Sequence, residues 1–392
     1  MAKPKILFVH TLSSGVTYWR FINFVKYMKK SEDFEISIFP EYDVNVVHIS
    51  EWELKFDSKD QEYYKYVCDL FESADILIFQ AIHKYKVLGL IDALVNHAGK
   101  KIICESDDYI FGIPSDHTAS SAFYPGSNIE DLQWKQMLVS QSMVVSTPYL
   151  KRMYDPWNRD IHVIPNAIDF ELWKSKRRKK DAGGLRIGYV GGQQHNRDLY
   201  VLREVIPAIC KSHEGVRFVI WGGHPDVFSE KYERIKKYCE FPQWERINKY
   251  PSAYAEKGFD IVISPLLDNA LNRAKSNLKW LEASALKIPF VGSNVLPYKE
   301  SIVQGETGFI IQDNKDWVQA LSLLIKDPSL RKRMGENAYE EVKKNWNVEE
   351  VARQYLKVIK SVKNVSFRNT YKDLNVESNL ERNFVNGSNY VN

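Results

Sequence analysis

The chain has 392 residues, of which 44% are hydrophobic, and this is enough for two domains with apolar cores. The formal charge of +4 is too small for a dedicated nucleic-acid-binding protein, although it is compatible with anionic ligands or contact with an anionic membrane surface. The four cysteines are scattered, and no Cys-x-x-Cys pair indicates a zinc site or a disulfide framework. No apolar run reaches the length of a membrane span or a secretory signal, so we expect a cytoplasmic protein, at most peripheral to the inner membrane face.

The first half of the chain alternates short apolar strands with helical segments. Strands are predicted at residues 5–9, 34–39, 74–79, 101–104, 142–146 and 162–165. Helices are predicted at about 18–30 and 87–97. Alternation of this kind predicts a parallel sheet with right-handed crossover connections.

After residue 173 the pattern breaks and then restarts. Residues 174–184 are charged and end in two glycines, and since no aromatic residues interleave with the charges, an interdomain linker is favoured over a nucleic-acid-binding patch. Strands are then predicted at 185–190, 216–221, 261–265 and 288–292, and helices at 198–211, 327–344 and 348–363. The Asn-rich residues 366–392 predict a flexible tail.

The most informative motif lies between the last two predicted strands. It contains Lys275, Lys279 and Glu282 at spacings that a helix would place on one face. A helix that begins at Ser276–Asn277 after a strand presents backbone N–H groups and its positive dipole end to an anion. The lysines add full positive charge, and the carboxylate suits a sugar hydroxyl. Together with Asn272 at its start, the motif predicts a site for a nucleotide diphosphate.

A glycine pair, Gly191 and Gly192, follows the first strand of the second half. Glycine allows a phosphate to approach closely, but the third glycine of a dinucleotide-binding fingerprint is missing, and a plain tight turn explains the pair equally well. His195 and Arg197 come next, at the mouth of the sheet where ligands bind, and we expect one of them to contact the ligand. Asp198 is expected to cap the following helix.

Acidic residues, among them the adjacent Asp107 and Asp108, end the fourth predicted strand. Such a pair can bind a metal ion or form an ordinary surface turn, and its place at the ligand edge of the sheet leaves both interpretations open. Asp107 is the first candidate to accept a proton from an attacking hydroxyl. His83, at the end of the neighbouring strand, is the rival base and ranks lower, because a lone histidine is more often a structural hydrogen-bonding group.

One further segment, Pro165–Asp169, reads locally as a turn with an Asx-type hydrogen bond. The chain has no Gly-x-Ser-x-Gly elbow, His-Glu-x-x-His helix or Walker loop, so hydrolase and P-loop interpretations are not favoured.

These motifs together resemble the retaining glycosyltransferases of the GT-B fold, of the glycosyl transferases group 1 (family 4-like) type. The resemblance is strongest from residue 185 to 346. Its markers are Gly191-Gly192 with His195-x-x-Asp198, Ser264-Pro265-Leu266, Asn272-x-x-Lys275-Ser276-x-x-Lys279-x-x-Glu282, Gly305-x-Thr307-Gly308-Phe309, Glu105-x-Asp107-Asp108 and Pro165-Asn166-x-Ile168-Asp169. They are specific for the superfamily and not for a substrate.

The resemblance implies an α/β protein of two Rossmann-like domains with parallel sheets that face each other across a cleft. Residues 1–173 would bind the acceptor, with 348–365 packing back on them, and residues 185–347 would bind the nucleotide sugar. Family likeness also places Glu282 on the ribose of the nucleotide and Gly15 near the donor phosphates.

Two features depart from the family pattern. Ala274 stands where a second glutamate is usual, and Gln193 and Gln194 follow the glycine pair where many members carry an Arg and a Lys. Lys275 and Arg197 are the candidates to supply that charge.

We therefore expect transfer of a sugar from a nucleotide diphosphate to a hydroxyl with retention of configuration, in polysaccharide or glycoconjugate synthesis. Lys275, the helix start at Ser276–Asn277 and the amides of the glycine pair would stabilise the leaving diphosphate, so no metal ion or other cofactor is expected. The acceptor stays open among a glycan, a lipid-linked group and a nucleic acid. Two alternatives remain: glycosylation of modified DNA bases, and a non-catalytic nucleotide-sugar-binding module, which the two departures motivate.

Overall fold

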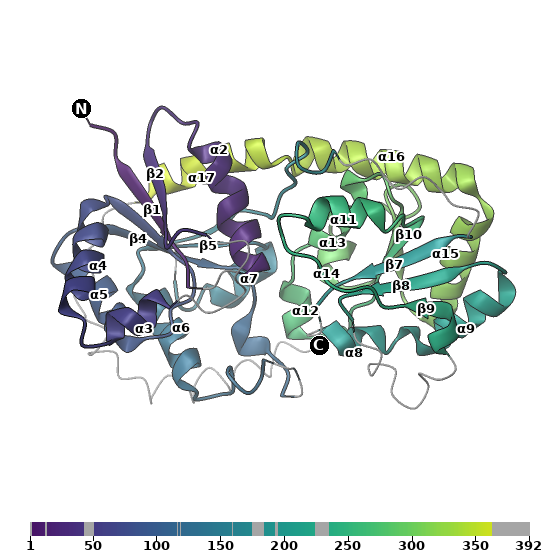
Figure 1. Cartoon of the computed structure of the whole chain (residues 1–392), viewed down its shortest axis with the longest axis horizontal. Helices are drawn as coiled ribbons and strands as arrows, with labels where there is room; N and C mark the ends of the chain where they lie inside the picture. The colour runs from purple at the N-terminus through teal and green to yellow at the C-terminus, as the bar shows by residue number, and fades with distance from the viewer. Residues whose placement is uncertain are drawn as a thin grey trace.

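A computed structural model describes residues 2–11, 14–42, 51–115, 117, 119–158, 160–174, 184–192, 195–223 and 235–362. Two lobes lie side by side, each around a six-stranded sheet in which neighbouring strands pair in parallel (Figure 1). All ten predicted strands are present, with ends within two residues of the expected ones. Most of the predicted linker 174–184 and all of the predicted tail 366–392 lie outside the described residues.

The first sheet has the strand order β2-β1-β3-β4-β5-β6. Its strands are β1 (Lys5–Val9), β2 (Glu35–Phe39), β3 (Ile76–Phe79), β4 (Lys101–Ser106), β5 (Ser142–Val145) and β6 (Ile161–Val163). The helices of this lobe are α1 (Gly15–Thr17), α2 (Asn23–Met28), α3 (Trp52–Asp57), α4 (Gln61–Ser73), α5 (Tyr85–Asn96), α6 (Asn128–Val139) and α7 (Pro148–Tyr154), with short helical turns η1 (Tyr18–Ile22) and η2 (Ile110–Gly112). Because side chains alternate along a strand, Ile6 and Phe8 join the core on the α2 face, and Leu7 and Val9 join the core on the α3–α5 face.

The second sheet has the order β12-β11-β10-β7-β8-β9. Its strands are β7 (Arg186–Val190), β8 (Arg217–Trp221), β9 (Cys239–Glu240), β10 (Ile261–Ser264), β11 (Phe290–Ser293) and β12 (Phe309–Ile311). The helices are α8 (Asn196–Leu199), α9 (Leu202–Ser212), α11 (Tyr250–Glu256), α12 (Ala270–Ala274), α13 (Leu278–Ala285), α14 (Leu296–Lys299), α15 (Asn314–Lys326) and α16 (Pro328–Asn345), with a turn η5 (Lys236–Tyr238). The strand order reverses between β7 and β10, and in such sheets ligands bind outside the carboxyl ends of these two strands.

The last described helix, α17 (Val348–Ser361), leaves the second lobe and packs on the first (Figure 1). The ring of Tyr355 meets Phe8 and Phe24 edge-on, with centroids 6.1 and 5.9 Å apart. Where the chain crosses between lobes, Ile168 pairs with the segment before α17 through backbone hydrogen bonds to Trp346 and Val348 of 2.8 and 3.0 Å. The two segments that run between the lobes are therefore hydrogen-bonded to each other.

The first predicted helix begins earlier than expected and is not uniform. The Ser14 side chain caps α1 by accepting from the Thr17 N–H, and a π-helical turn, η1, follows before α2. The wider turn directs three successive side chains, Trp19, Arg20 and Phe21, into the interior. This places the buried charge of Arg20 beneath the end of the sheet.

Two edge strands of the second sheet, β9 and β12, were not predicted, because two and three residues carry too little pattern. The predicted helix 198–211 is split into α8 and α9 by a turn at Tyr200 and Val201. No helix within the described ranges combines the length and hydropathy needed to cross a membrane.

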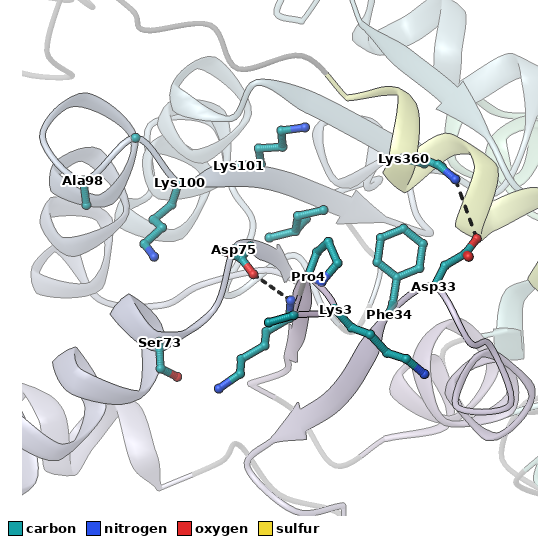
Figure 2. A pocket seen from close by; sticks show the side chains of 14 residues that line it. Lys3, Pro4, Asp33, Phe34, Ser73, Asp75, Ala98, Lys100, Lys101 and Lys360 are labelled. Carbon is teal, nitrogen blue, oxygen red and sulfur yellow. Dashed lines mark hydrogen bonds and ion pairs between the residues drawn. The ribbon is translucent and has the colours of Figure 1, made fainter.

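The amino edge of the first sheet carries an open cavity of about 950 Å³, lined by five lysines (Figure 2). Its two carboxylates are engaged, since Asp75 accepts the Lys5 backbone N–H at 2.7 Å and Asp33 lies 3.6 Å from Lys360. Lys360 lies in the last turn of α17, and Lys100 follows α5, positions that favour cations electrostatically. The cavity lies at the opposite strand ends from the expected ligand edge.

Because α17 packs against the first lobe, shortening one of its buried side chains should destabilise the protein strongly. Ile359→Ala should lower the free energy of unfolding by about 2–5 kcal/mol, because a fully buried aliphatic side chain leaves a cavity. Gln354→Ala, on the exposed face of the same helix, should stay within about 0.5 kcal/mol of the parent. Urea unfolding measures both; an Ile359→Ala effect no larger than that of the control would show that α17 is not packed in solution.

Candidate functional site

The carboxyl ends of both sheets face a common region where the lobes touch. Three hydrogen bonds cross it: Lys275 Nζ to Asp108 Oδ1 at 2.8 Å, Asn166 Nδ2 to Ser276 Oγ at 2.8 Å, and Thr147 Oγ1 to the Ala274 carbonyl at 3.1 Å. All of them end on the last residue of α12 or on the short link between α12 and α13. The most informative sequence motif therefore lies at the contact between the lobes.

The prediction that Lys275, Lys279 and Glu282 share one helical face is wrong. Helix α12 ends at Ala274, the backbone of Lys275 is extended with ψ 151°, and α13 begins after Asn277. Contacts across the lobes override the local helical pattern. As a result the Lys275 side chain reaches the first lobe, while the other two side chains lie inside the second.

The ion pair between Lys275 and Asp108 keeps both groups charged. Burial opposes ionisation of each, but their mutual attraction prevails, so the pKa of Asp108 is lowered and the pKa of Lys275 is raised. The Tyr154 and Ser106 hydroxyls donate to the Asp108 backbone carbonyl at 2.6 and 3.2 Å. Those bonds fix the turn that presents the carboxylate.

The ammonium group of Lys279 is buried and has no hydrogen-bond acceptor among the described residues. It lies 4.8 Å from the ring centroid of Tyr189, and a Cβ built on Gly191 would lie 3.0 Å from Nζ. Burial lowers the pKa of Lys279 to about 8, with Lys275 adding repulsion and Asp198 opposing the shift. A buried cation without a hydrogen-bond partner favours an anionic ligand on electrostatic grounds.

The glycine loop is shaped by packing. A Cβ on Gly191 would come within 2.5 Å of the Tyr189 hydroxyl, and the Gly191 N–H donates to the Trp221 carbonyl at 3.1 Å. The Gly191 amide is thus already hydrogen-bonded to the neighbouring strand. Of the two glycines, Gly192 is left as the candidate to donate a backbone hydrogen bond to a phosphate. The Gly192 carbonyl accepts from the His195 N–H at 3.0 Å, while residues 193 and 194 lie outside the described residues.

The predicted helix cap at Asp198 is wrong, because its carboxylate joins the loops after β7 and β10. It accepts from the Leu267 N–H at 2.8 Å and Asn272 Nδ2 at 2.9 Å, and lies 3.0 Å from His195 Nδ1. A carboxylate only accepts, so Nδ1 of His195 carries the proton and Nε2 is an acceptor. Burial, with Lys279 adding repulsion, lowers the pKa of His195 to about 4, so its ring is neutral at pH 7. The side chain of Asn272 therefore helps to hold the Asp198 carboxylate in place.

The remaining residues that were predicted to bind the nucleotide sugar differ in exposure. Arg197 is exposed on α8, outside the buried cluster. Glu282 is buried and accepts from the Tyr250 hydroxyl at 2.9 Å; burial raises its pKa to about 8, against that hydrogen bond and the nearby Lys279. Asn277 donates to Ser301 Oγ at 2.9 Å. Glu282 and Asn277 therefore both have internal partners.

Ala274, which replaces the usual glutamate, is fully buried against an apolar cluster of the first lobe that includes Met143, Leu150 and Tyr154. A carboxylate in this position would be desolvated among apolar side chains. The departure from the family pattern thus has a packing reason.

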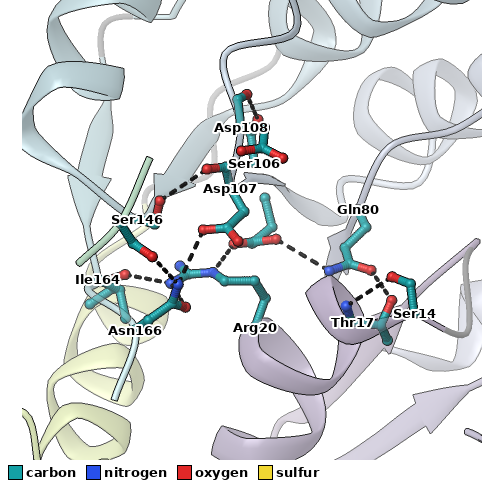
Figure 3. Close-up of polar contacts among 12 residues, drawn as sticks. Ser14, Thr17, Arg20, Gln80, Ser106, Asp107, Asp108, Ser146, Ile164 and Asn166 are labelled. Carbon is teal, nitrogen blue, oxygen red and sulfur yellow. Dashed lines mark hydrogen bonds and ion pairs between the residues drawn. The ribbon is translucent and has the colours of Figure 1, made fainter. Parts of the chain in front are cut away.

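In the first lobe, Asp107 lies in a buried polar network (Figure 3). Its backbone carbonyl accepts from the Ser146 hydroxyl at 3.2 Å, and its Oδ1 lies 3.5 Å from Asn166 Nδ2. Burial raises the pKa of Asp107, while the buried Arg20 opposes that rise. No group of three or more metal-binding side chains was found in the described part of the chain.

The predicted Asx-type turn is present, and Asp169 makes it. Its Oδ1 accepts from the backbone N–H groups of Glu171 and Leu172 at 3.0 and 3.3 Å, whereas the Asn166 side chain makes long-range contacts. The local sequence pattern therefore located the turn correctly.

His83 has a partner that sequence reasoning missed. The buried Glu53 accepts from the His83 backbone N–H and lies against ring atom Nδ1, both at 3.0 Å. This contact orients the ring and makes Nε2 the acceptor, as a general base requires. Glu53 precedes His83 by 30 residues and lies in α3, so no local signal marks it.

Gly15 lies at the start of α1, and a Cβ built on it would meet no atom within 4 Å.

Comparison with known proteins identifies the class to which this fold and site belong. The chain superposes with a TM-score of 0.66 on the crystal structure of Anabaena HepE in complex with UDP and glucose, at 14% identity, covering 91% of this chain and 100% of that one. A glycosyltransferase from Rickettsia africae gives a TM-score of 0.64 at 15% identity, covering 92% and 99%. With two parallel sheets, these similarities confirm the predicted GT-B fold.

Residues 184–327 match the family model "Glycosyl transferases group 1". The gpi3 subunit of phosphatidylinositol N-acetylglucosaminyltransferase from Schizosaccharomyces pombe is 26% identical over 204 residues, 52% of this chain and 44% of the relative. D-inositol 3-phosphate glycosyltransferase from Corynebacterium glutamicum is 25% identical over 238 residues, 53% and 54% of the two chains. The chain spans about half the length of these curated relatives.

Because the Lys279 ammonium is buried without a hydrogen-bond partner, we expect it to lower the free energy of unfolding. Lys279→Met should raise the free energy of unfolding at pH 7 by about 1–3 kcal/mol, because the replacement removes an unsatisfied buried group. The folded pKa of about 8 lies below the ordinary 10.5, so the unfolded state binds more protons between these values and wild-type stability rises there with pH. The gain from Lys279→Met should therefore be complete below pH 8 and shrink above it.

Urea unfolding of wild type and variant between pH 7 and 10 measures this difference. Lys249→Met, which replaces an exposed lysine of the same lobe, is the matched control and should change little. A net loss of stability in Lys279→Met would show that the ammonium has a compensating partner in solution.

Proposed function

We propose that the protein transfers a glycosyl group from a nucleotide-diphosphate sugar to an acceptor hydroxyl. The observation that carries the proposal is the buried, unpaired Lys279 at the point where the strand order of the second sheet reverses. A nucleotide diphosphate would supply the missing negative charge. The group 1 glycosyltransferase domain supports this function, as does the UDP and glucose bound by the similar fold of Anabaena HepE.

Positive charge would stabilise the leaving group. As the glycosidic bond breaks, charge builds on the diphosphate, and Lys279, Lys275 and the start of α13 would face it. An incoming phosphate would compete with Asp108 for Lys275, which ties donor binding to the contact between the lobes. We propose that this fixed charge replaces a divalent cation. We also propose retention of configuration and a role in glycan or glycoconjugate synthesis, on family likeness.

Two groups of the first lobe are candidates to accept the proton of the acceptor hydroxyl. Asp107 is a carboxylate whose pKa burial raises, which makes it a stronger base than an exposed aspartate. His83 has the orienting carboxylate of Glu53. Asp107 stays the first candidate because it contacts Asn166, which bonds directly to the donor-loop residue Ser276.

A panel of nucleotide sugars should contain at least one that raises the melting temperature and is slowly hydrolysed. A ligand at 100 times its Kd adds about 2.7 kcal/mol of stability. Lys279→Met should weaken donor binding by about 10- to 100-fold, the loss of one charge-assisted contact. Lys249→Met should bind like the parent.

Hydrolysis should also continue in excess EDTA, since the lysines supply the charge. Loss of activity with chelator and recovery with Mg²⁺ or Mn²⁺ would contradict the metal-free proposal. Stabilisation by a nucleotide sugar without any turnover would indicate the non-catalytic binding module instead.

The two candidate bases can be separated by isosteric variants. Asp107→Asn should lower donor hydrolysis by about 10²–10⁴-fold while leaving donor-induced stabilisation intact, and His83→Gln should cost less. A base must be deprotonated, so wild-type activity should fall as pH drops through the raised pKa of Asp107. The reverse ranking of the variants would assign the base to His83.

A further inference from the structure

The side chain of Asn166 lies fully buried at the junction of the two lobes and uses its polar atoms on three partners. Its Oδ1 accepts from Arg20 Nη1 at 3.0 Å. Its Nδ2 donates to Ser276 Oγ at 2.8 Å and lies 3.5 Å from Asp107 Oδ1. One amide thus connects the donor loop of the second lobe to the candidate base of the first.

Arg20 fixes which way this amide faces. A guanidinium only donates, so the amide oxygen of Asn166 must face Arg20 and the NH₂ group must face the cleft. Arg20 is itself held by the Glu105 carboxylate and by the Ile164 carbonyl at 2.8 Å, within the buried network of Figure 3. The π-helical turn that buries Arg20 therefore orients Asn166.

The two hydrogens of the Asn166 NH₂ group serve the two lobes. One is directed to Ser276, a residue within reach only when the lobes are in contact. With that bond made, the amide plane is fixed, and the second hydrogen faces Asp107. A hydrogen bond to the ionised form of a carboxylate stabilises it and lowers its pKa.

We infer that Asn166 is a positioning residue that couples lobe closure at the donor loop to the ionisation of Asp107; this inference rests on the proposed function. With the lobes apart, the bond to Ser276 is lost, and Arg20 alone holds the amide. Asp107 then loses a fixed donor in an environment that disfavours its charge. The base is consequently ready when the donor loop is in place.

The other contacts between the lobes act on Asp107 differently. The charge of Lys275, from the second lobe, lowers the pKa of Asp107 at a distance, while the neighbouring Asp108 raises it and Ser146 opposes that rise from within the first lobe. Thr147 bonds to the Ala274 carbonyl, and Lys275 pairs with Asp108, but no hydrogen bond from either reaches the Asp107 side chain within the described residues. Asn166 is the side chain seen here that contacts both the Asp107 carboxylate and the second lobe.

A double-mutant cycle tests the coupling, with the nucleotide sugar that the wild type hydrolyses fastest as the probe. Asn166→Ala and Ser276→Ala should each lower kcat for hydrolysis by about 10- to 100-fold and move the acidic limb of the pH–rate profile to higher pH. The double variant should resemble Asn166→Ala alone, because both changes remove the same path. Ser276→Thr, which keeps the hydroxyl, should restore the position of the limb.

Thr147→Ala is the matched control. It removes a hydrogen bond between the lobes without touching Asp107, so the acidic limb should not move, although loss of the α7 cap should lower the melting temperature. If Asn166→Ala does not fold, Ser276→Ala and its Thr rescue still decide the question. Independent, multiplicative losses in the cycle, or an equal displacement of the limb in Thr147→Ala, overturn the inference. A wild type inert toward all nucleotide sugars overturns the proposed function, and with it the coupling.

Discussion

The site depends on positive charge that the protein buries and leaves uncompensated. Lys279 has no hydrogen-bond acceptor among the described residues, and Lys275 is neutralised only by a carboxylate of the other lobe. The glycine at 191 gives room beside Lys279, because a Cβ there would come within 2.5 Å of the Tyr189 hydroxyl and 3.0 Å of the ammonium. A fold optimised for stability alone would not keep this arrangement, since an unpaired buried cation is unfavourable. An anion that pairs with Lys279 during the proposed reaction would account for this arrangement.

The buried lysines also bear on the contact between the lobes, because Lys275 of the second lobe pairs with Asp108 of the first. Ala274 at the end of α12 and the link that follows it make the three hydrogen bonds described above between the facing edges of the lobes, and the extended backbone at Lys275 allows them. An anion bound at Lys279 would lie on a segment whose neighbours already bond to the first lobe. Donor binding and lobe contact are then linked, because each changes the electrostatic surroundings of the other. The buried Arg20 extends this link by fixing Asn166 from within the first lobe.

The fold was predictable because its strands are short apolar runs at regular spacing, and the motif residues cluster at one edge of each sheet by topology alone. Side-chain partners were less predictable. Asp198 was assigned to a helix cap, since sequence distance suggests local bonds, yet its carboxylate also accepts from Leu267 and Asn272, 69 and 74 positions away. The contacts of Asn166 with Arg20 and Ser276, 146 and 110 positions away, carried no local signal either. Glu53 carried no signal, because its partner His83 lies in another element. The break after α12 was missed because contacts from the other lobe produce it.

The exchange of a glutamate for Ala274 shows how the second lobe has been adapted to the first. The alanine methyl packs against an apolar cluster of the first lobe, and its carbonyl accepts from Thr147, so the position now serves contact between lobes. A glutamate there would need a polar partner that the cluster does not provide. If the protein transfers a sugar as proposed, polar contacts to that sugar would come from neighbouring groups, and Lys275 with Asp108 is the pair that lies next to this position. Donor selectivity would then be shared between both lobes, because the carboxylate comes from one and the ammonium from the other.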